Sequence, residues 1–124
     1  MRKKKILIID DEEDFLKLTK IYLEKVGKYE VMTESSGKAG VAAAVQFKPD
    51  LIFLDILIPD MEGADIAAKI KDDIRAKDIP IVFLSAVVTN QEVSSHGGFI
   101  GGYPCIAKPI DAKDLIDYIE KNVK

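Results

Sequence analysis

The stretch from Pro49 to Gly63 reads PDLIFLDILIPDMEG, and its first half decides the fold class. Four apolar residues, from Leu51 to Leu54, follow one another without a polar break and end at Asp55. A strand that is apolar on both faces usually lies in the centre of a parallel sheet that helices cover on both sides. The stretch therefore predicts a buried central strand that ends in a carboxylate.

Four other segments have the character of strands. Ile6–Ile9 and Ile81–Leu84 are also unbroken apolar runs and are expected in the centre of the sheet. Tyr29–Thr33 mixes polar and apolar residues, and Tyr103–Ala107 contains Pro104. Mixed polarity and an internal proline are typical of edge strands, so these two segments are expected at the sheet edges.

Helical patterns lie between the predicted strands. The second helix is expected over Ser36–Phe47 and the third over Gly63–Ile74, while Gly27 ends the first and Asp111 caps the last. The apolar stripes consist of Phe15, Leu18, Tyr22 and Val26 in the first helix and of Leu115, Ile116, Ile119 and Val123 in the last. The alternation predicts an α/β three-layer sandwich around a parallel five-stranded sheet, and the strand order 2-1-3-4-5 fits it.

The fourth helix has the weakest pattern. Residues 87–102 contain β-branched residues, two adjacent serines and four glycines, all of which disfavour a helix. We predict a short, late or mobile helix in this segment. His96, the one histidine of the chain, lies beside glycines and is expected to be an ordinary loop residue.

Length and composition favour one domain over residues 1–124. The chain has 124 residues, of which 48% are hydrophobic, and a formal net charge of −3. This charge argues against a general nucleic-acid or anionic-membrane binder. The single cysteine excludes an internal disulfide and fits a reducing cytoplasm. Ile6–Ile9 is too short for a membrane span, so no membrane association is expected.

Polar residues stand where the predicted strands end. These residues are Asp10, Asp11, Asp55, Ser85 and Lys108. In a parallel sheet all these ends lie at one edge, where open α/β sheets bind their ligands. Each residue alone could be a helix cap or an ordinary loop residue, but the five together predict a functional site.

Three carboxylates at one edge repel one another and need a compensating charge. Mg²⁺ is the natural partner, because it prefers oxygen ligands such as carboxylates, water and phosphate. One carboxylate could then act as a nucleophile toward phosphorus. Lys108 and Ser85 are suited to neutralise and bind the oxygens of a transferred phosphoryl group.

Four segments together resemble the receiver domain of bacterial two-component response regulators. They are Ile6–Asp14, Pro49–Gly63, Ile79–Ala86 and Ala107–Asp111. The resemblance extends over nearly the whole chain and implies a flavodoxin-like (βα)5 fold. It also implies a signalling switch that catalyses its own aspartyl phosphorylation and dephosphorylation, rather than an enzyme that turns over a separate substrate.

The resemblance implies a role for each strand-end residue. Asp55 would be the phosphoacceptor and a Mg²⁺ ligand, Asp11 would bind Mg²⁺ directly, and Asp10 would bind it through water. The backbone carbonyl of Leu57 would be a further Mg²⁺ ligand. Ser85 would bind the phosphoryl group and move toward it, and Lys108 would pair with that group. Glu12 could touch the metal site through water.

The resemblance also implies partners. The phosphodonor would be a sensor histidine kinase or a histidine phosphotransfer protein. The output would be a changed face of helix 4, strand 5 and helix 5 that acts on a downstream protein or a fused effector domain, and a phosphorylation-dependent dimer would be compatible with it. Direct nucleic-acid binding is not expected. Whether the chain stands alone or is one domain of a longer protein stays open.

Several positions depart from the family pattern or qualify it. Cys105 stands where an aromatic residue is usual, and Tyr103 would point to the same side of an ideal strand. Output could then work through ordering of the glycine-rich segment instead of an aromatic switch. Leu57 and Val87 are apolar and cannot orient an attacking water, so we predict a long-lived phosphoryl group. The Lys108–Pro109 bond is expected to be cis.

Three other functions compete with this one. A small Mg²⁺-dependent phosphohydrolase would place its nucleophile after the first strand in an Asp-x-Asp motif, which Asp10-Asp11-Glu12 lacks. A flavodoxin-like cofactor carrier would need a phosphate-binding loop there, and this segment is acidic. A degenerate receiver that only docks or dimerises is the third alternative, although all five site residues are present.

Overall fold

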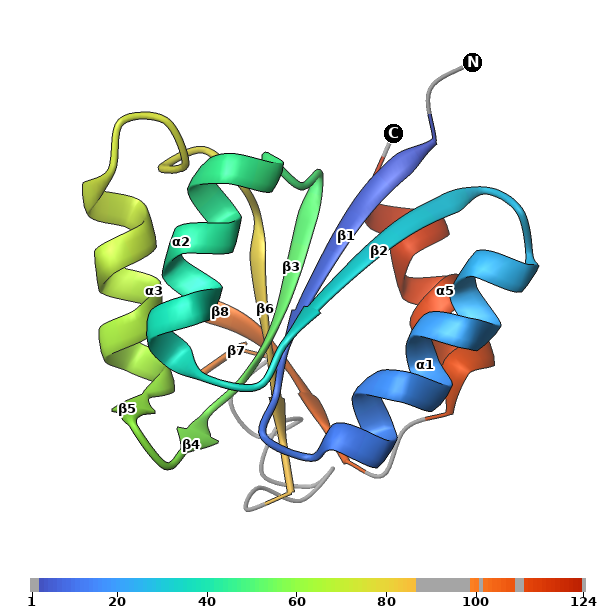
Figure 1. Ribbon diagram of the computed structural model, residues 1–124, viewed down its shortest axis with the longest axis horizontal. Helices are drawn as coiled ribbons and strands as arrows, with labels where there is room; N and C mark the ends of the chain where they lie inside the picture. The colour runs from blue at the N-terminus through green and yellow to red at the C-terminus, as the bar shows by residue number, and fades with distance from the viewer. Residues whose placement is uncertain (1–2, 87–98, 101, 109–110, 124) are drawn as a thin grey trace.

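A sheet that is parallel except at one edge forms the centre of the molecule (Figure 1). The computed structural model describes residues 3–86, 99–100, 102–108 and 111–123. The strands are β1 (Lys4–Ile9), β2 (Tyr29–Glu34), β3 (Leu51–Asp55), β6 (Ile81–Ser85), β7 (Phe99–Ile100) and β8 (Tyr103–Ala107). Their order is β2-β1-β3-β6-β8-β7, and all neighbours except β8 and β7 pair in parallel. The five parallel strands β2, β1, β3, β6 and β8 confirm the predicted sheet, in which they correspond to strands 2, 1, 3, 4 and 5.

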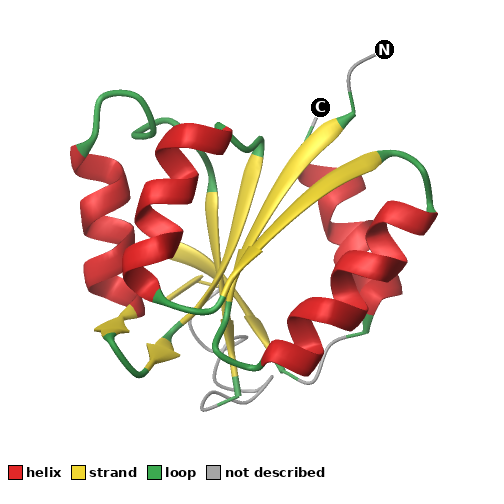
Figure 2. Ribbon diagram, in the orientation of Figure 1, coloured by secondary structure: helices red, strands yellow, loops and turns green. Residues whose placement is uncertain are grey.

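Helices cover both faces of the sheet, as the alternating pattern predicted. They are α1 (Glu13–Lys25), α2 (Gly37–Phe47), α3 (Gly63–Asp72) and α5 (Ala112–Asn122). Figure 2 shows α2 and α3 on one face and α1 and α5 on the other, which confirms the three-layer sandwich. A small antiparallel hairpin of β4 (Leu57–Ile58) and β5 (Met61–Glu62) connects β3 to α3.

The central strands are apolar throughout because each faces two cores. In β3, Ile52 and Leu54 belong to the core under α2 and α3, while Leu51 and Phe53 belong to the core under α1 and α5. The strands β1 and β6 alternate in the same way. Successive side chains of a strand point to opposite faces, so an unbroken apolar run is what a doubly covered strand requires.

Side-chain caps stabilise the starts of α5 and α2, which lie near the edge of the sheet where the parallel strands end. Asp111 accepts a hydrogen bond from the backbone N–H of Asp114 at 2.9 Å, which confirms it as the predicted cap of α5. Ser36 caps α2 by accepting a bond from the N–H of Ala39 at 3.1 Å. Asp60, from the β4–β5 turn, accepts a further bond from the N–H of Gly37 at 2.8 Å. A carboxylate at this helix start is favourable because the first turn has unpaired N–H groups.

The apolar stripe that predicted α1 is largely exposed, and a different side of the helix packs onto the sheet. The buried side of α1 is formed by Leu16, Thr19 and Leu23, with Phe15 half-buried beside them. Leu18 is 68% exposed, and Tyr22 is 47% exposed. Helix α1 has apolar residues on two sides, so periodicity alone could not choose the side that meets the sheet. Gly27, with φ 85°, ends the helix as predicted.

The last edge of the sheet differs from the prediction. The two-residue strand β7 pairs antiparallel with β8, so β8 is partly covered along its outer side. Gly102 precedes β8 with φ 86°, a conformation that favours glycine at a chain reversal. Residues 87–98, where the weak fourth helix was expected, lie outside the described residues, and Phe99–Ile100 is a strand. Among the described helices, none has the length and apolarity needed to cross a bilayer.

Candidate functional site

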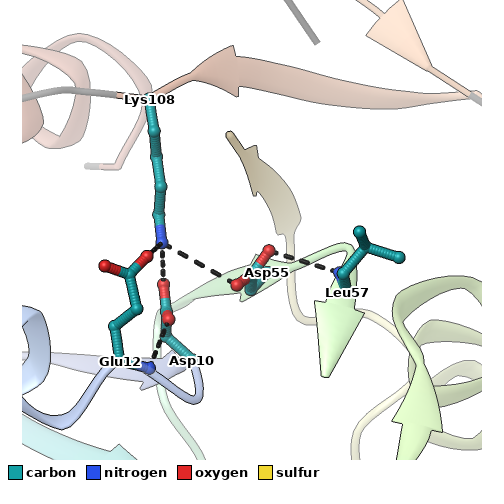
Figure 3. A network of polar contacts seen from close by, with 5 residues as sticks. All are labelled: Asp10, Glu12, Asp55, Leu57 and Lys108. Carbon is teal, nitrogen blue, oxygen red and sulfur yellow. Dashed lines mark hydrogen bonds and ion pairs between the residues drawn. The ribbon is translucent and has the colours of Figure 1, made fainter. Parts of the chain in front are cut away.

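The predicted site residues meet at the carboxyl edge of the sheet. Asp10 and Asp11 follow β1, Asp55 ends β3, Ser85 ends β6 and Lys108 follows β8. Parallel pairing brings these ends together, and the backbone N–H of Lys108 donates to the carbonyl of Ser85 at 2.8 Å. Figure 3 shows the side chains of Asp10, Asp55 and Lys108 converging there. The structure therefore places these residues close together, as their positions at the strand ends predicted.

Three carboxylates form the acidic part of the site. One oxygen each of Asp10, Asp11 and Asp55 lies within 4.8 Å of the other two. Asp10 is fully buried and Asp55 is 7% exposed, whereas Asp11 is exposed. Such a set of oxygen donors, open on one side to solvent, fits a hard divalent cation such as Mg²⁺.

Asp10 and Asp11 are not the N-cap of α1, the alternative role that the sequence left open for them. The N-cap of this helix is Glu12, whose side chain makes no capping hydrogen bond to the described backbone. Asp10 instead accepts a bond from the Glu12 N–H at 2.9 Å with one oxygen and faces the site with the other. This bond fixes the loop that carries both aspartates at the end of β1.

Lys108 supplies the positive charge of the site. Its Nζ lies 2.5 Å from Asp10 Oδ2, 2.8 Å from Glu12 Oε1 and 3.8 Å from Asp55 Oδ2 (Figure 3). Burial lowers the pKa of the ammonium, but its bonds to Asp10 and Glu12 and the nearby Asp55 outweigh burial and raise the pKa above its ordinary value. The lysine is therefore a permanent cation at neutral pH.

Asp55 has the most perturbed acidity in the site. Burial is the largest cause that raises its pKa from 3.8 to about 6, and repulsion by Asp10 adds to it. Lys108 and the N–H of Leu57, which lies 3.3 Å from Asp55 Oδ1, act in the opposite direction. Without a metal ion, the negative charge on Asp55 is thus incompletely compensated, even with Lys108 nearby.

This pKa shift predicts a pH-dependent stability. The unfolded chain binds a proton at Asp55 with a pKa near 4, so the folded chain holds more protons between about pH 4 and pH 6. Stability therefore falls as the pH rises through this window. We expect Asp55→Asn to raise the free energy of unfolding by about 1–2 kcal/mol above about pH 7, and to change it little below about pH 4.

Urea unfolding in EDTA at the two pH values measures this difference. Asp14→Asn, at an exposed position of α1, is the matched control and should show no gain at the higher pH. If the Asp55→Asn variant differs from the wild type by the same amount at both pH values, the argument from burial is contradicted.

The structure describes only some of the remaining residues that the sequence singled out. Ser85 is buried at the end of β6, one position after the Asp55–Leu84 pair of the sheet register. Leu57 donates its backbone N–H to Asp55, and the residue is 55% exposed. A metal contact from the Leu57 carbonyl stays a prediction. The positions of Val87, His96 and Pro109, and with Pro109 the expected cis bond, lie outside the described residues.

Cys105 and Tyr103 lie on the same side of β8. Both pack with the core under α2 and α3, as the alternation along a strand predicted despite Pro104. The Tyr103 ring meets Phe83 edge to face, with 5.2 Å between the ring centroids. Burial raises the pKa of the Cys105 thiol, which lowers the fraction of the reactive thiolate at neutral pH.

Two contacts of the site were missed in the sequence. Glu12 was considered only for a contact with the metal site through water, and in the structure its carboxylate accepts a bond from Lys108. Phe15 was assigned to a helix stripe, but its ring centroid lies 4.6 Å from Lys108 Nζ. The available signal was their position, since both residues closely follow the aspartates of the site at the start of α1.

Known proteins resemble this chain over nearly all of its length. The family model of the response regulator receiver domain matches residues 6–120. The regulatory protein NisR of nisin biosynthesis in Lactococcus lactis is 38% identical over 120 residues, which are 97% of this chain and 50% of that protein. RpaA of Synechocystis, named a DNA-binding dual master transcriptional regulator, is 36% identical over 112 residues, which are 90% of this chain and 46% of that protein.

Solved structures show the same fold. A CheY-like response regulator receiver domain from Methanospirillum hungatei superposes with a TM-score of 0.79 and 29% identity, covering 97% of this chain and 93% of that one. The N-terminal domain of a receiver protein from Methanoculleus marisnigri gives a TM-score of 0.69 and 32% identity, covering 95% and 94%. These likenesses agree with the flavodoxin-like sandwich.

The chain spans about half the length of the curated relatives it matches. Because one of these relatives is named as DNA-binding, the expectation of no direct nucleic-acid binding gains no support from the comparisons. The fold, the strand-end residues and the match over residues 6–120 agree with one another. The chain belongs to the response regulator receiver family, the signalling switches of two-component systems.

Proposed function

We propose that this chain accepts a phosphoryl group on Asp55 in a Mg²⁺-dependent reaction. The observation that carries the proposal is the arrangement of Asp10, Asp11 and Asp55, whose carboxylate oxygens lie within 4.8 Å of one another beside the Lys108 ammonium. Asp55 suits the role of nucleophile better than Asp10, because both carboxylate oxygens of Asp10 already accept hydrogen bonds, one from the Glu12 N–H and one from Lys108. Residues 1–124 would then act as one receiver domain.

The transfer step forms one bond and breaks another. A carboxylate oxygen of Asp55 forms a bond to phosphorus while the P–N bond of a phosphohistidine donor breaks. The imidazole nitrogen of the donor keeps the electron pair of that bond. Lys108, 3.8 Å from Asp55 Oδ2, is placed to pair with an oxygen of the transferred group. Such charge neutralisation and alignment contribute most of the catalysis of phosphoryl transfer.

The acidic group is the proposed place for Mg²⁺. Asp11, Asp55 and the Leu57 carbonyl would bind it directly, and Asp10 would bind it through water. When bound, the ion neutralises the carboxylates and the charge that develops on the phosphoryl oxygens. The buried Ser85 would donate its hydroxyl to the phosphoryl group and move toward it.

The proposed partners follow from this chemistry. The donor would be a sensor histidine kinase or a histidine phosphotransfer protein in the cytoplasm. Phosphorylation would shift the population of conformers at the face that contains β8 and α5, and this face would act on a downstream protein or a fused effector domain. A phosphorylation-dependent dimer is one form that such an output could take.

Intact mass spectrometry tests the proposal. The purified chain is incubated with acetyl phosphate, once with Mg²⁺ and once with EDTA. We expect a gain of one phosphoryl group with Mg²⁺ and none with EDTA. A folded chain that binds Mg²⁺ but gains no phosphoryl group would support the alternative of a docking module instead.

The phosphoryl group is expected to be long-lived because Leu57 cannot orient water. Leu57 is 55% exposed beside Asp55, and its side chain carries no group that could hydrogen-bond an attacking water. Leu57→Asn supplies such a group, and we expect it to speed the loss of the phosphoryl group by about tenfold. The decay is followed by intact mass after removal of acetyl phosphate.

Leu18→Asn, which places the same amide on an exposed position of α1, is the control and should leave the decay unchanged. Rapid loss from the wild type, with the same rate after Leu57→Asn, would show that Leu57 does not control hydrolysis.

A further inference from the structure

Lys108 lies closer to Asp10 and Glu12 than to Asp55. Its Nζ lies 3.8 Å from Asp55 Oδ2, beyond hydrogen-bonding distance, but donates to Asp10 at 2.5 Å and to Glu12 at 2.8 Å. The Phe15 ring lies against the same ammonium, with 4.6 Å from Nζ to the ring centroid. The side chain of Lys108 is 7% exposed, so these contacts replace most of its water.

The contacts of Glu12 and Phe15 come from the same short segment at the start of α1. Glu12 is the N-cap residue, and its N–H is bound by Asp10 at 2.9 Å, which fixes its place over the lysine. Phe15 is half-buried, so its ring is held by packing rather than free in solvent. An aromatic face attracts an ammonium more strongly when both are partly removed from water.

We propose that Phe15 and Glu12 are positioning residues that hold Lys108 at rest beside Asp10, in competition with the pairing of Lys108 to a phosphoryl group on Asp55. The inference rests on the proposed function of Asp55. One ammonium has three N–H donors, and two of them are used by Asp10 and Glu12 in the resting position. One donor remains for a phosphoryl group on Asp55, so pairing with two of its oxygens requires Lys108 to give up its bond to Asp10 or to Glu12.

The first consequence concerns the affinity for a phosphoryl mimic. Phe15→Leu keeps an apolar side chain but removes the aromatic face, so the resting position is weakened without a change of charge. We expect beryllofluoride, with saturating Mg²⁺, to bind this variant about three- to tenfold more tightly. Phe15→Tyr keeps the ring face and should bind as the wild type does, which separates the ring's electrostatic role from simple packing.

Glu12→Gln tests the other contact. We expect a gain in beryllofluoride affinity of about two- to fivefold, since an ion pair with a largely exposed partner contributes little. Removal of one negative charge near the site would by itself favour an anion. Glu13→Gln, with the same change of charge at the next residue, is therefore the matched control, and its gain should be smaller.

A measurement without any phosphoryl mimic reports the resting position directly. In the ¹⁵N-lysine-labelled chain, slow hydrogen exchange at the Lys108 ammonium marks its bonds to Asp10 and Glu12. We expect this exchange to be about three- to tenfold faster in Phe15→Leu and Glu12→Gln, and unchanged in Phe15→Tyr and Glu13→Gln.

The results separate this inference from the proposed function. If the wild type does not bind beryllofluoride at all, the proposed function fails, whatever the lysine exchange shows. If beryllofluoride binds but Phe15→Leu and Glu12→Gln leave its affinity unchanged or weaken it, the competition proposed for Lys108 is overturned. Tighter binding in both variants, together with faster lysine exchange, is the result that the resting position predicts.

Discussion

Replacing Asp55 with Asn is expected to abolish the uptake of a phosphoryl group, lowering the rate with acetyl phosphate at least about a thousandfold. An amide cannot act as the nucleophile that a carboxylate oxygen provides. The substitution is nearly isosteric. It also removes a buried carboxyl group whose pKa is raised to about 6 and whose ionisation disfavours the folded state, so the variant should remain folded. Loss of uptake would then come from chemistry and not from unfolding.

Intact mass after incubation with acetyl phosphate and Mg²⁺ measures this effect. Asp14→Asn removes an exposed carboxylate near the same edge of the sheet and should leave uptake unchanged. If the Asp55→Asn variant still gains one phosphoryl group at the wild-type rate, another residue is the acceptor and the account of the site is wrong.

Replacing Gly63 with Ala is expected to cost about 2–4 kcal/mol of folding free energy, a large effect for the addition of one methyl group. A Cβ at Gly63 would lie 2.7 Å from the Cα of Ile56 and 2.9 Å from the carbonyl oxygen of Asp55. Both are backbone atoms, so a change of rotamer cannot relieve the contact. The N–H of Gly63 also binds the Ile56 carbonyl at 2.7 Å, which holds α3 against this loop.

Urea unfolding measures the loss, and a second glycine provides the control. Gly27 has φ 85° but nothing within 4 Å of an added Cβ, so Gly27→Ala introduces backbone strain without crowding. We expect that variant to lose only about 1 kcal/mol. Because the crowded atoms at Gly63 belong to Asp55 and Ile56, Gly63→Ala should also slow phosphoryl uptake, whereas Gly27→Ala should not. Equal losses of stability in the two variants would contradict the packing argument.

The sheet could be predicted because its signals are local. Apolar runs such as Leu51–Leu54 specify strands that are buried on both faces, and the structure places them in the centre of the sheet. The covering helices could also be located, since Gly27 and Asp111 mark an end and a start through backbone geometry and a side-chain cap. These features depend on residues close together in the chain.

The buried side of α1 could not be predicted from its pattern. Leu18 and Tyr22 are as suited to an apolar stripe as Leu16 and Leu23, and only contact with the sheet and α5 decides which pair is buried. The bond from the Gly37 N–H to Asp60 has the same origin, because it joins residues that are distant in the chain. Such contacts follow from tertiary packing, and no local rule specifies them.

The site was predictable in its members but not in its internal pairing. The rule that parallel strands end at one edge was enough to bring Asp10, Asp55 and Lys108 together. It could not show that Lys108 lies closer to Asp10 and Glu12 than to Asp55. That choice depends on side-chain geometry and on the balance of three carboxylates around one cation.

The charges around Lys108 indicate how the site could respond to a metal ion and a phosphoryl group. Asp55 carries a charge that burial and Asp10 make unfavourable, while Lys108 is engaged elsewhere. A cation bound by the aspartates would relieve the repulsion, and a phosphoryl group on Asp55 would offer Lys108 a new partner. In the proposed switch, a few charged contacts would exchange partners at the sheet edge.

The position of the phosphoryl group tests the central claim most directly. The chain is incubated with acetyl phosphate and Mg²⁺, reduced with borohydride, digested and sequenced by mass spectrometry. Borohydride converts an aspartyl phosphate to homoserine, so the acceptor is marked at its own position in the sequence. We predict homoserine in place of Asp55 and nowhere else. Homoserine in place of Asp10 or Asp11, or a phosphoryl group retained on another residue type, would contradict the account.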